Sequence, residues 1–204
     1  MMATTHALAG MVLASVTVAL APEHAPLAVG AAAAGGAFPD LDLAGRHRRT
    51  LHFPVYYSVA AVALTALAVA RPAPVTVALA TFFAAAGLHS VTDAFGGGLE
   101  LKPWEGTSDR AVYDHHRGLW VRPRRWIRYD GALEDVALAA ILAAPTLAVG
   151  GPAVRRLVLA LVAVSVVYGV LRKPLVAVAA WLVAVLPPSV LEWIPGRFVE
   201  ELSE

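Results

Sequence analysis

The sequence contains no cysteine among its 204 residues, and charged side chains make up only 15% of it. The absence of cysteine excludes disulfide bonds and thiolate metal ligands. Soluble domains typically carry about 25% charged and about 45–50% apolar residues, whereas this chain is 58% hydrophobic. Its net charge of +1 also argues against a dedicated nucleic-acid-binding protein. The composition therefore indicates an integral membrane protein.

The hydrophobic residues are gathered into runs, most of them near the ~20 residues that span a bilayer. They predict an all-α protein, a polytopic transmembrane bundle of about seven helices in a single integral membrane domain over residues 1–204. The expected helices cover residues 5–21, 26–38, 54–70, 75–93, 133–149, 153–171 and 175–186. The second is short and rich in Ala and Gly, a composition that permits close helix packing. The first has no preceding Lys or Arg, so we expect a retained helix and not a secretory signal.

Two segments remain outside these helices. Residues 94–132 form a long basic connection, which we expect to be cytoplasmic. Residues 187–204 form a C-terminal tail in which apolar and acidic side chains mix, a composition typical of a segment that lies in the membrane interface.

Four polar clusters interrupt the apolar pattern: Thr5-His6, Asp40 with Asp42, the segment 47–52 (HRRTLH), and His89 with Asp93. His89 and Asp93 are four residues apart and so share one face of a helix. Ionisable groups at the edge of a membrane helix are costly to place there and are functional candidates. An even number of crossings separates each cluster from the first, so all four are predicted to meet at one membrane face.

The basic residues assign that face to the cytoplasm. The face of the four clusters holds Arg46, Arg48, Arg49, Lys102, Arg110, Arg117, Arg122, Arg124, Arg125, Arg128, Arg172 and Lys173. The opposite face is expected to hold Arg71, Arg155, Arg156 and Arg197. Short cytoplasmic loops carry an excess of Lys and Arg, so the N-terminus and the clusters are predicted to be cytoplasmic.

Imidazole and carboxylate groups together are ligands for a divalent metal ion, zinc above all, with manganese or iron as alternatives. The candidate metal ligands are His6, Asp40, Asp42, His52, His89 and Asp93. Asp42 or Asp93 is a candidate general base if it does not bind the metal. Arg48 and Arg49 are candidates for holding an anionic group such as a phosphate.

Each of these residues has a simpler explanation when taken alone. His89 and Asp93 can form a hydrogen-bonded pair that only joins two helices. Asp40 and Asp42 can cap helices, and His6 can be an interfacial side chain. Arginines in the loop can be topology signals or lipid contacts. The predicted co-location of the clusters is what favours a site.

These motifs resemble those of the membrane-bound metal-dependent hydrolase family of bacteria and archaea. The matching pieces are Thr5-His6 and residues 38–42, 47–52, 87–93, 101–104 and 125–131, in this order. The resemblance implies that His6, Asp40, Asp42, His52, His89 and Asp93 bind a metal. The chain departs from the family at Phe53, where a small hydroxyl residue is usual. The order also resembles one metal site of zinc-dependent phospholipases C and nucleases, without their further His-x-x-x-Glu pair.

Two functions follow as hypotheses. The first is a metal-dependent hydrolase embedded in the cell membrane, acting on an anionic phosphoester or a lipid-linked substrate at the cytoplasmic face. The alternative is a non-catalytic integral membrane protein with a structural metal or a hydrogen-bonded His/Asp cluster. A transporter is disfavoured because the helices offer few polar residues near mid-membrane. The bilayer itself is the one partner that the composition predicts.

Overall fold

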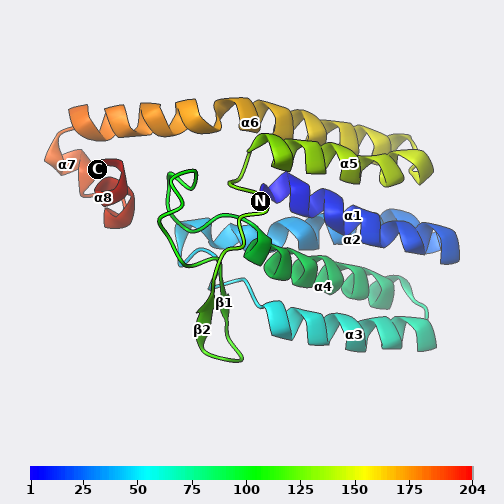
Figure 1. The fold of residues 1–204 in the computed structure, drawn as a ribbon. Helices are drawn as coiled ribbons and strands as arrows, with labels where there is room; N and C mark the ends of the chain where they lie inside the picture. Colours follow the sequence, from blue (N-terminus) through cyan, green and yellow to red (C-terminus); the bar gives the residue numbers. More distant parts are fainter. Residues whose placement is uncertain (204) are drawn as a thin grey trace.

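The computed structural model describes residues 1–203 and consists mainly of helices that lie side by side (Figure 1). The six long helices are α1 (Ala3–Leu20), α2 (Ala25–Ala37), α3 (Pro54–Ala70), α4 (Pro74–Thr92), α5 (Leu133–Val149) and α6 (Pro152–Val185). Short 3-10 turns cover η1 (Pro22–His24), η2 (Phe38–Ala44) and η3 (Asp93–Phe95). The chain ends with α7 (Pro188–Leu191) and α8 (Gly196–Ser203).

The helical character predicted from the sequence is confirmed. Among the described residues, two segments are long and apolar enough to cross a membrane, Pro74–Phe95 and Pro152–Val185. Ala3–Thr17 and Pro54–Ala70 are shorter apolar helices. Every long helix begins or ends close to a proline, a glycine or a polar cluster of the sequence, as expected from the way these residues interrupt helices.

The long connection adds a small antiparallel hairpin of β1 (Val112–Asp114) and β2 (Leu119–Val121) to the otherwise helical chain. Gly118 lies in the turn with a φ of +69°, a conformation open to glycine. The amide of Tyr113 donates to the carbonyl of Arg48, which ties the hairpin to the segment 47–52. The hairpin projects from one end of the bundle (Figure 1).

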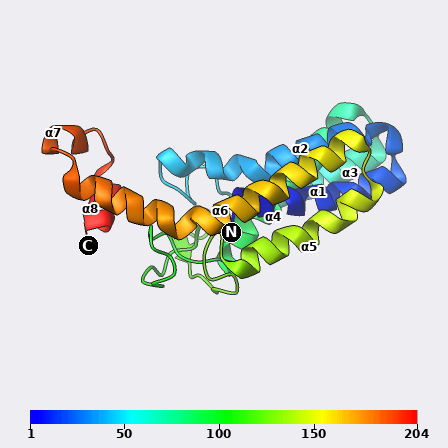
Figure 2. The ribbon, with the colours of Figure 1, turned by 90° about the horizontal axis from the view of Figure 1, so that it is seen from above.

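The prediction of separate helices over 153–171 and 175–186 is wrong, because α6 continues through Pro174. An interior proline removes one helical hydrogen bond and kinks a helix without necessarily ending it. At 1.5 Å per residue α6 is about 51 Å long, longer than the ~30 Å of a hydrocarbon core. Its C-terminal part extends beyond the ends of the other long helices (Figure 2).

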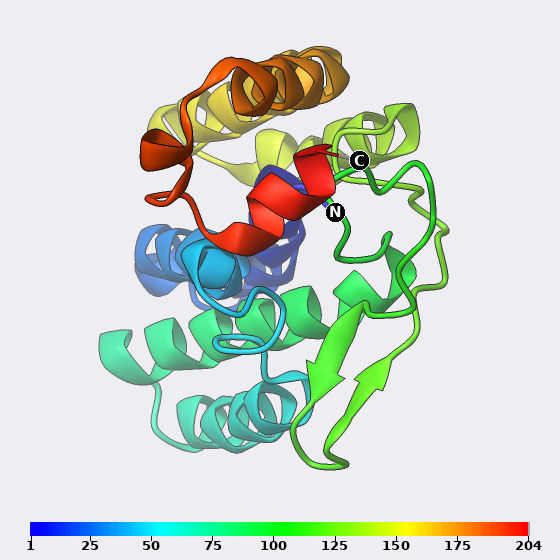
Figure 3. The same cartoon turned by 90° about the vertical axis from the view of Figure 1, so that its left-hand side faces the viewer.

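Because α6 is continuous, the C-terminal tail lies at the hairpin end of the bundle, and not at the opposite end, where two separate helices would place it. Seen from the hairpin end, α8 lies across the bundle in front of α1 and α2 (Figure 3). Arg197 donates to the carbonyl of Leu43 at 2.8 Å, and the amide of Leu101 donates to Glu201 at 2.7 Å. Arg197 therefore belongs with the basic residues of the hairpin end, and not with Arg71 and Arg155.

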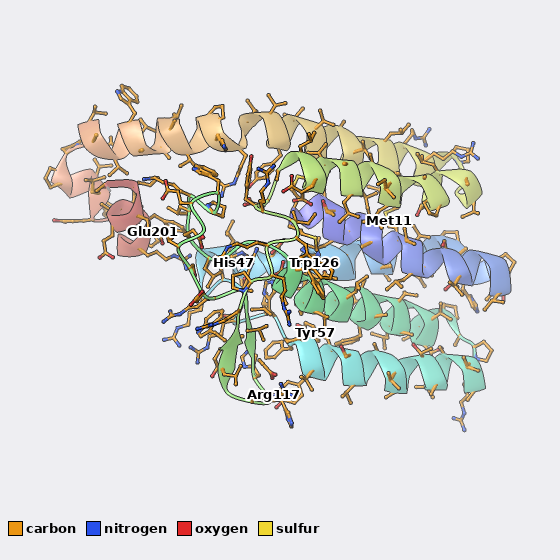
Figure 4. All side chains as sticks on the ribbon, in the orientation of Figure 1. Met11, His47, Tyr57, Arg117, Trp126 and Glu201 are labelled. Carbon is orange, nitrogen blue, oxygen red and sulfur yellow. The ribbon has the colours of Figure 1, made fainter. Side chains whose placement is uncertain are left out.

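Glycines allow α2 to lie unusually close to its neighbours, as its small residues predicted. A Cβ on Gly36 would lie 2.5 Å from the carbonyl oxygen of His6 in α1. A Cβ on Gly35 would lie 2.2 Å from the carbonyl oxygen of Phe82 in α4. Helix α2 thus meets α1 and α4 backbone to backbone, and Met11 of α1 is fully buried on the side of α1 that faces α5 (Figure 4). This packing brings the ends of the three helices together.

Candidate metal centre

Four of the predicted site residues converge at the hairpin end of the bundle. Asp40 lies in η2, His52 lies just before α3, and His89 and Asp93 lie at the end of α4. One ligand atom from each of the four lies within 4.8 Å of all the others. Three segments that are distant in the sequence therefore supply a group of two imidazoles and two carboxylates.

The spacing of these atoms matches a coordination shell. His52 Nε2 lies 3.2 Å from His89 Nε2 and 3.2 Å from Asp93 Oδ2. His89 Nε2 lies 3.5 Å from Asp93 Oδ2, and Asp40 Oδ1 lies 3.4 Å from His89 Nε2 and 3.8 Å from His52 Nε2. Ligands at 2.0–2.2 Å from a tetrahedral metal are separated by about 3.3–3.6 Å. The observed separations scatter around that value.

The other nitrogen of each imidazole is already engaged. His89 Nδ1 donates to the carbonyl oxygen of Gly36 at 2.6 Å, and His52 Nδ1 lies 3.1 Å from Asp42 Oδ2. A carbonyl only accepts, so the proton of a neutral His89 is on Nδ1 and the lone pair is on Nε2. The same assignment holds for His52 beside a carboxylate. Such hydrogen bonds orient imidazoles for metal binding.

A cation would relieve two unfavourable features of this arrangement. When His52 and His89 are both neutral, the lone pairs of their Nε2 atoms face one another across 3.2 Å, and two acceptors without a proton or cation between them repel. Asp93 Oδ2 is buried, and its nearest donors, His52 Nε2 at 3.2 Å and Arg48 Nε at 3.5 Å, form no well-aligned hydrogen bond with it, which is costly for a buried acceptor. The residues present therefore fit a divalent metal ion.

Asp42, a predicted ligand, lies outside this group of four. Its carboxylate accepts hydrogen bonds from His47 Nδ1, the amides of Arg48 and Leu51, and His52 Nδ1. Burial by itself would raise the pKa of Asp42, but these donors hold it well below its ordinary value. The structure thus places Asp42 behind His52, where it orients the ring. His47 lies at the same end of the bundle (Figure 4).

His6 lies beside the four residues and contacts two of them. Its ring stacks on that of His89 with 3.7 Å between centroids. His6 Nε2 lies 3.1 Å from Asp93 Oδ1, the carboxylate oxygen that does not face the cluster. His6 therefore steadies His89 and Asp93.

The two arginines proposed to hold an anion are placed differently. The guanidinium of Arg48 is buried, donates to the carbonyl of Gly97 at 2.7 Å, and lies 3.5 Å from Asp93 Oδ2. The guanidinium of Arg49 lies over the ring of Tyr113, 4.3 Å from its centroid. Arg48 thus compensates charge inside the cluster, whereas Arg49 contacts the hairpin.

Two further site groups outside the long helices have shifted pKa values. Burial raises the pKa of Asp40, but hydrogen bonding and charge from His89 outweigh it and hold the pKa at about 2. Burial lowers the pKa of His52, but its contacts with Asp42 and Asp93 outweigh that effect and raise it. Carboxylates are thus kept ionised in the cluster.

The cluster is open to solvent only at Asp40. The Asp40 side chain is 23% exposed, whereas those of His52, His89 and Asp93 are at most 1% exposed. Anything that reaches the four residues from outside meets the Asp40 carboxylate first.

Sequence reasoning missed the role of Gly36, because a backbone acceptor carries no side-chain signal. Asp135 of α5 also lies outside the set of candidate residues, and it is fully buried. Asp135 accepts hydrogen bonds from the Thr5 hydroxyl and the Met2 amide, both at 2.8 Å. Its signal in the sequence is the position of an acidic side chain in the first turn of an otherwise apolar helix. Asp135 fixes the start of α1 and with it His6.

The chain matches no protein-family model, no curated protein and no solved structure in the three comparisons made. Membership of the membrane-bound metal-dependent hydrolase family therefore stays a prediction that rests on short motifs. The geometry of the cluster is the evidence that bears on function.

Proposed function

We propose that the protein is a multi-pass membrane hydrolase whose Asp40, His52, His89 and Asp93 bind a divalent metal at the cytoplasmic face. Its substrate class is a phosphoester or another anionic, lipid-linked compound. The observation that carries the proposal is the convergence of four ligand atoms from three segments at metal-shell spacing. Zinc suits two imidazoles and two carboxylates, and manganese and iron also accept this set.

The membrane placement is supported by the outer faces of the helices. Val62 and Val69 of α3 and Val166 and Val170 of α6 are large apolar side chains that the bundle leaves exposed. Lipid tails would cover them. The hairpin lies at the end of the bundle that holds the cluster (Figure 1), and the connection that carries it contains most of the arginines. By the positive-inside rule this is the cytoplasmic end.

The chain's own residues divide the work of such a centre. A divalent metal supplies Lewis acidity and makes water a better nucleophile at neutral pH. Asp42 and the Gly36 carbonyl hold the two imidazoles in the tautomer that a metal requires. His6 and Arg48 hold Asp93 from its two oxygens. Asp40, at the opening, is the residue that an incoming substrate would meet.

A second candidate is a structural metal site, and one feature of the cluster favours it. Catalytic zinc sites generally use three protein ligands and keep a fourth position open, whereas structural sites are closed by four. Here four protein ligands are present. Under this reading the metal would hold η2, α3 and α4 together without turnover.

The test is metal content and turnover of the full chain purified in detergent, beside a His89→Ala/Asp93→Ala variant. The matched control is His24→Ala/Glu23→Ala, which removes a His–acid pair outside the cluster, with 3.9 Å between His24 Nε2 and Glu23 Oε1. Thermal unfolding shows whether each variant is folded, and His52→Gln serves if the double variant is not.

We expect about one equivalent more metal in the wild type and the control than in the cluster variant after zinc or manganese loading. Hydrolysis of bis-p-nitrophenyl phosphate or of a fluorescent phospholipid that is lost with the metal supports the hydrolase. Bound metal with no turnover of either compound supports the structural site. Equal metal in the wild type and the cluster variant refutes both.

A further inference from the structure

The long connection and α6 line a partly open cavity of about 390 Å³ whose lining residues are separate from the metal cluster. The side chains that line it include Pro103, Trp104, Arg125, Arg128, Tyr129 and Lys173. Most of them come from residues 101–104 and 125–131, segments that the sequence singled out but that supply no ligand to the cluster. In the structure both segments therefore line the same cavity.

The cavity carries positive charge that the protein does not neutralise. Arg128 is paired with Glu134 through two hydrogen bonds of 2.8 and 3.1 Å. Arg125 donates only to backbone carbonyls, and its buried Nε has no partner. Lys173 makes no ion pair with any residue in the described part of the chain, 1–203. Two cations thus face the cavity without a counter-charge.

Aromatic rings hold Lys173 in place. Its amine lies 5.2 Å from the ring centroid of Trp104 and 5.4 Å from that of Tyr129, within the range of cation–π attraction. Arg172, next in the chain, pairs with Asp130 at 2.9 Å and donates to the carbonyl of Leu101. These contacts join α6 to both segments of the connection, so the cavity is built by several tertiary contacts.

We propose that this cavity binds a phosphate-bearing anion, the chemistry shared by the headgroup of an anionic phospholipid and by a free phosphate compound. Two uncompensated cations attract the phosphate. The Trp and Tyr rings beside them are side chains that favour the headgroup level of a membrane. The site does not depend on the metal, so its test is separate from that of the proposed function.

The experiment measures binding by native mass spectrometry of the full chain in non-ionic detergent, with phosphatidylglycerol or phosphatidylcholine added. Lys173→Glu is the test variant, because Lys173 donates no hydrogen bond to another residue in 1–203 that its loss would break. Arg122→Glu is the matched control: it makes the same charge change on the connection, outside the cavity, at a side chain that is 82% exposed. Far-ultraviolet circular dichroism and thermal unfolding check both variants.

We expect Lys173→Glu to weaken phosphatidylglycerol binding about thirtyfold, since each charge near an anionic surface contributes about 1 kcal/mol, and Arg122→Glu to change it little. Competition by 10 mM inorganic phosphate would show that a free phosphate suffices, and its failure would assign the site to a lipid headgroup. Equal loss in the two variants, or equal binding of phosphatidylglycerol and phosphatidylcholine by the wild type, overturns the proposal.

Discussion

Asp42→Asn separates a residue that orients a ligand from a ligand itself. In the wild type the two carboxylate oxygens of Asp42 accept four hydrogen bonds. The substitution keeps the side chain's size but leaves a single carbonyl oxygen as acceptor. Where the amide replaces Oδ2, it donates to His52 Nδ1. The proton of a neutral His52 then moves to Nε2, the atom that faces the metal position, and the lone pair there is lost.

Loss of such an orienting contact typically weakens metal binding 10–100-fold, or about 1.4–2.7 kcal/mol. We therefore expect Asp42→Asn to retain about one equivalent of zinc at saturation, with an affinity lower by that factor. The assay is competition between the purified protein and a chelating zinc indicator, beside thermal unfolding of the metal-free form. Asp109→Asn, at a side chain that is 71% exposed on the connection, is the matched control.

Two results would refute this reasoning. If Asp42→Asn fails to bind zinc at any concentration, as expected of His89→Ala/Asp93→Ala, then Asp42 is a ligand and the four-residue group is misassigned. If its affinity equals that of the control, then the hydrogen bond to His52 has no influence on the metal position.

Three other perturbations test the architecture around the site. Gly36→Ala places a Cβ 2.5 Å from a backbone oxygen, and in thermal melts it should lower the free energy of unfolding by about 1–3 kcal/mol. The control is Gly30→Ala in the same helix, where a Cβ meets nothing within 4 Å, and this change should be neutral or stabilising. Arg48→Ala leaves Asp93 buried without its cation and should cost about 3–5 kcal/mol in denaturant unfolding; an unchanged midpoint would contradict the buried ion pair. Single cysteines can be placed in this cysteine-free chain and labelled with an impermeant maleimide. Because α6 is continuous, positions 117 and 203 should be labelled from one side of the membrane and position 71 from the other. Labelling of 117 and 203 from opposite sides would instead support two separate helices over 153–171 and 175–186.

Local features of the sequence were enough to predict most helices. Apolar runs of defined length, interrupted by Pro22, Pro39, Pro54 and the glycines after Phe95, mark segments whose ends agree closely with α1 to α5. The same features led to the wrong end for α6, because Arg172, Lys173 and Pro174 are typical of a helix terminus. In the structure Arg172 pairs with Asp130, and the helix continues. A long-range ion pair is not visible in a local pattern.

The meeting of Asp40, His52, His89 and Asp93 followed from the order of the helices alone. Antiparallel helices of similar length return the chain to the same end after every second crossing, so sequence-distant clusters gather there. Which atoms face one another did not follow. Asp40 and Asp42 are two residues apart in the 3-10 helix η2, which has about three residues per turn, so they point in different directions. Only the packing of η2 against His52 and α4 turns Asp40 toward the cluster and Asp42 toward the far nitrogen of His52.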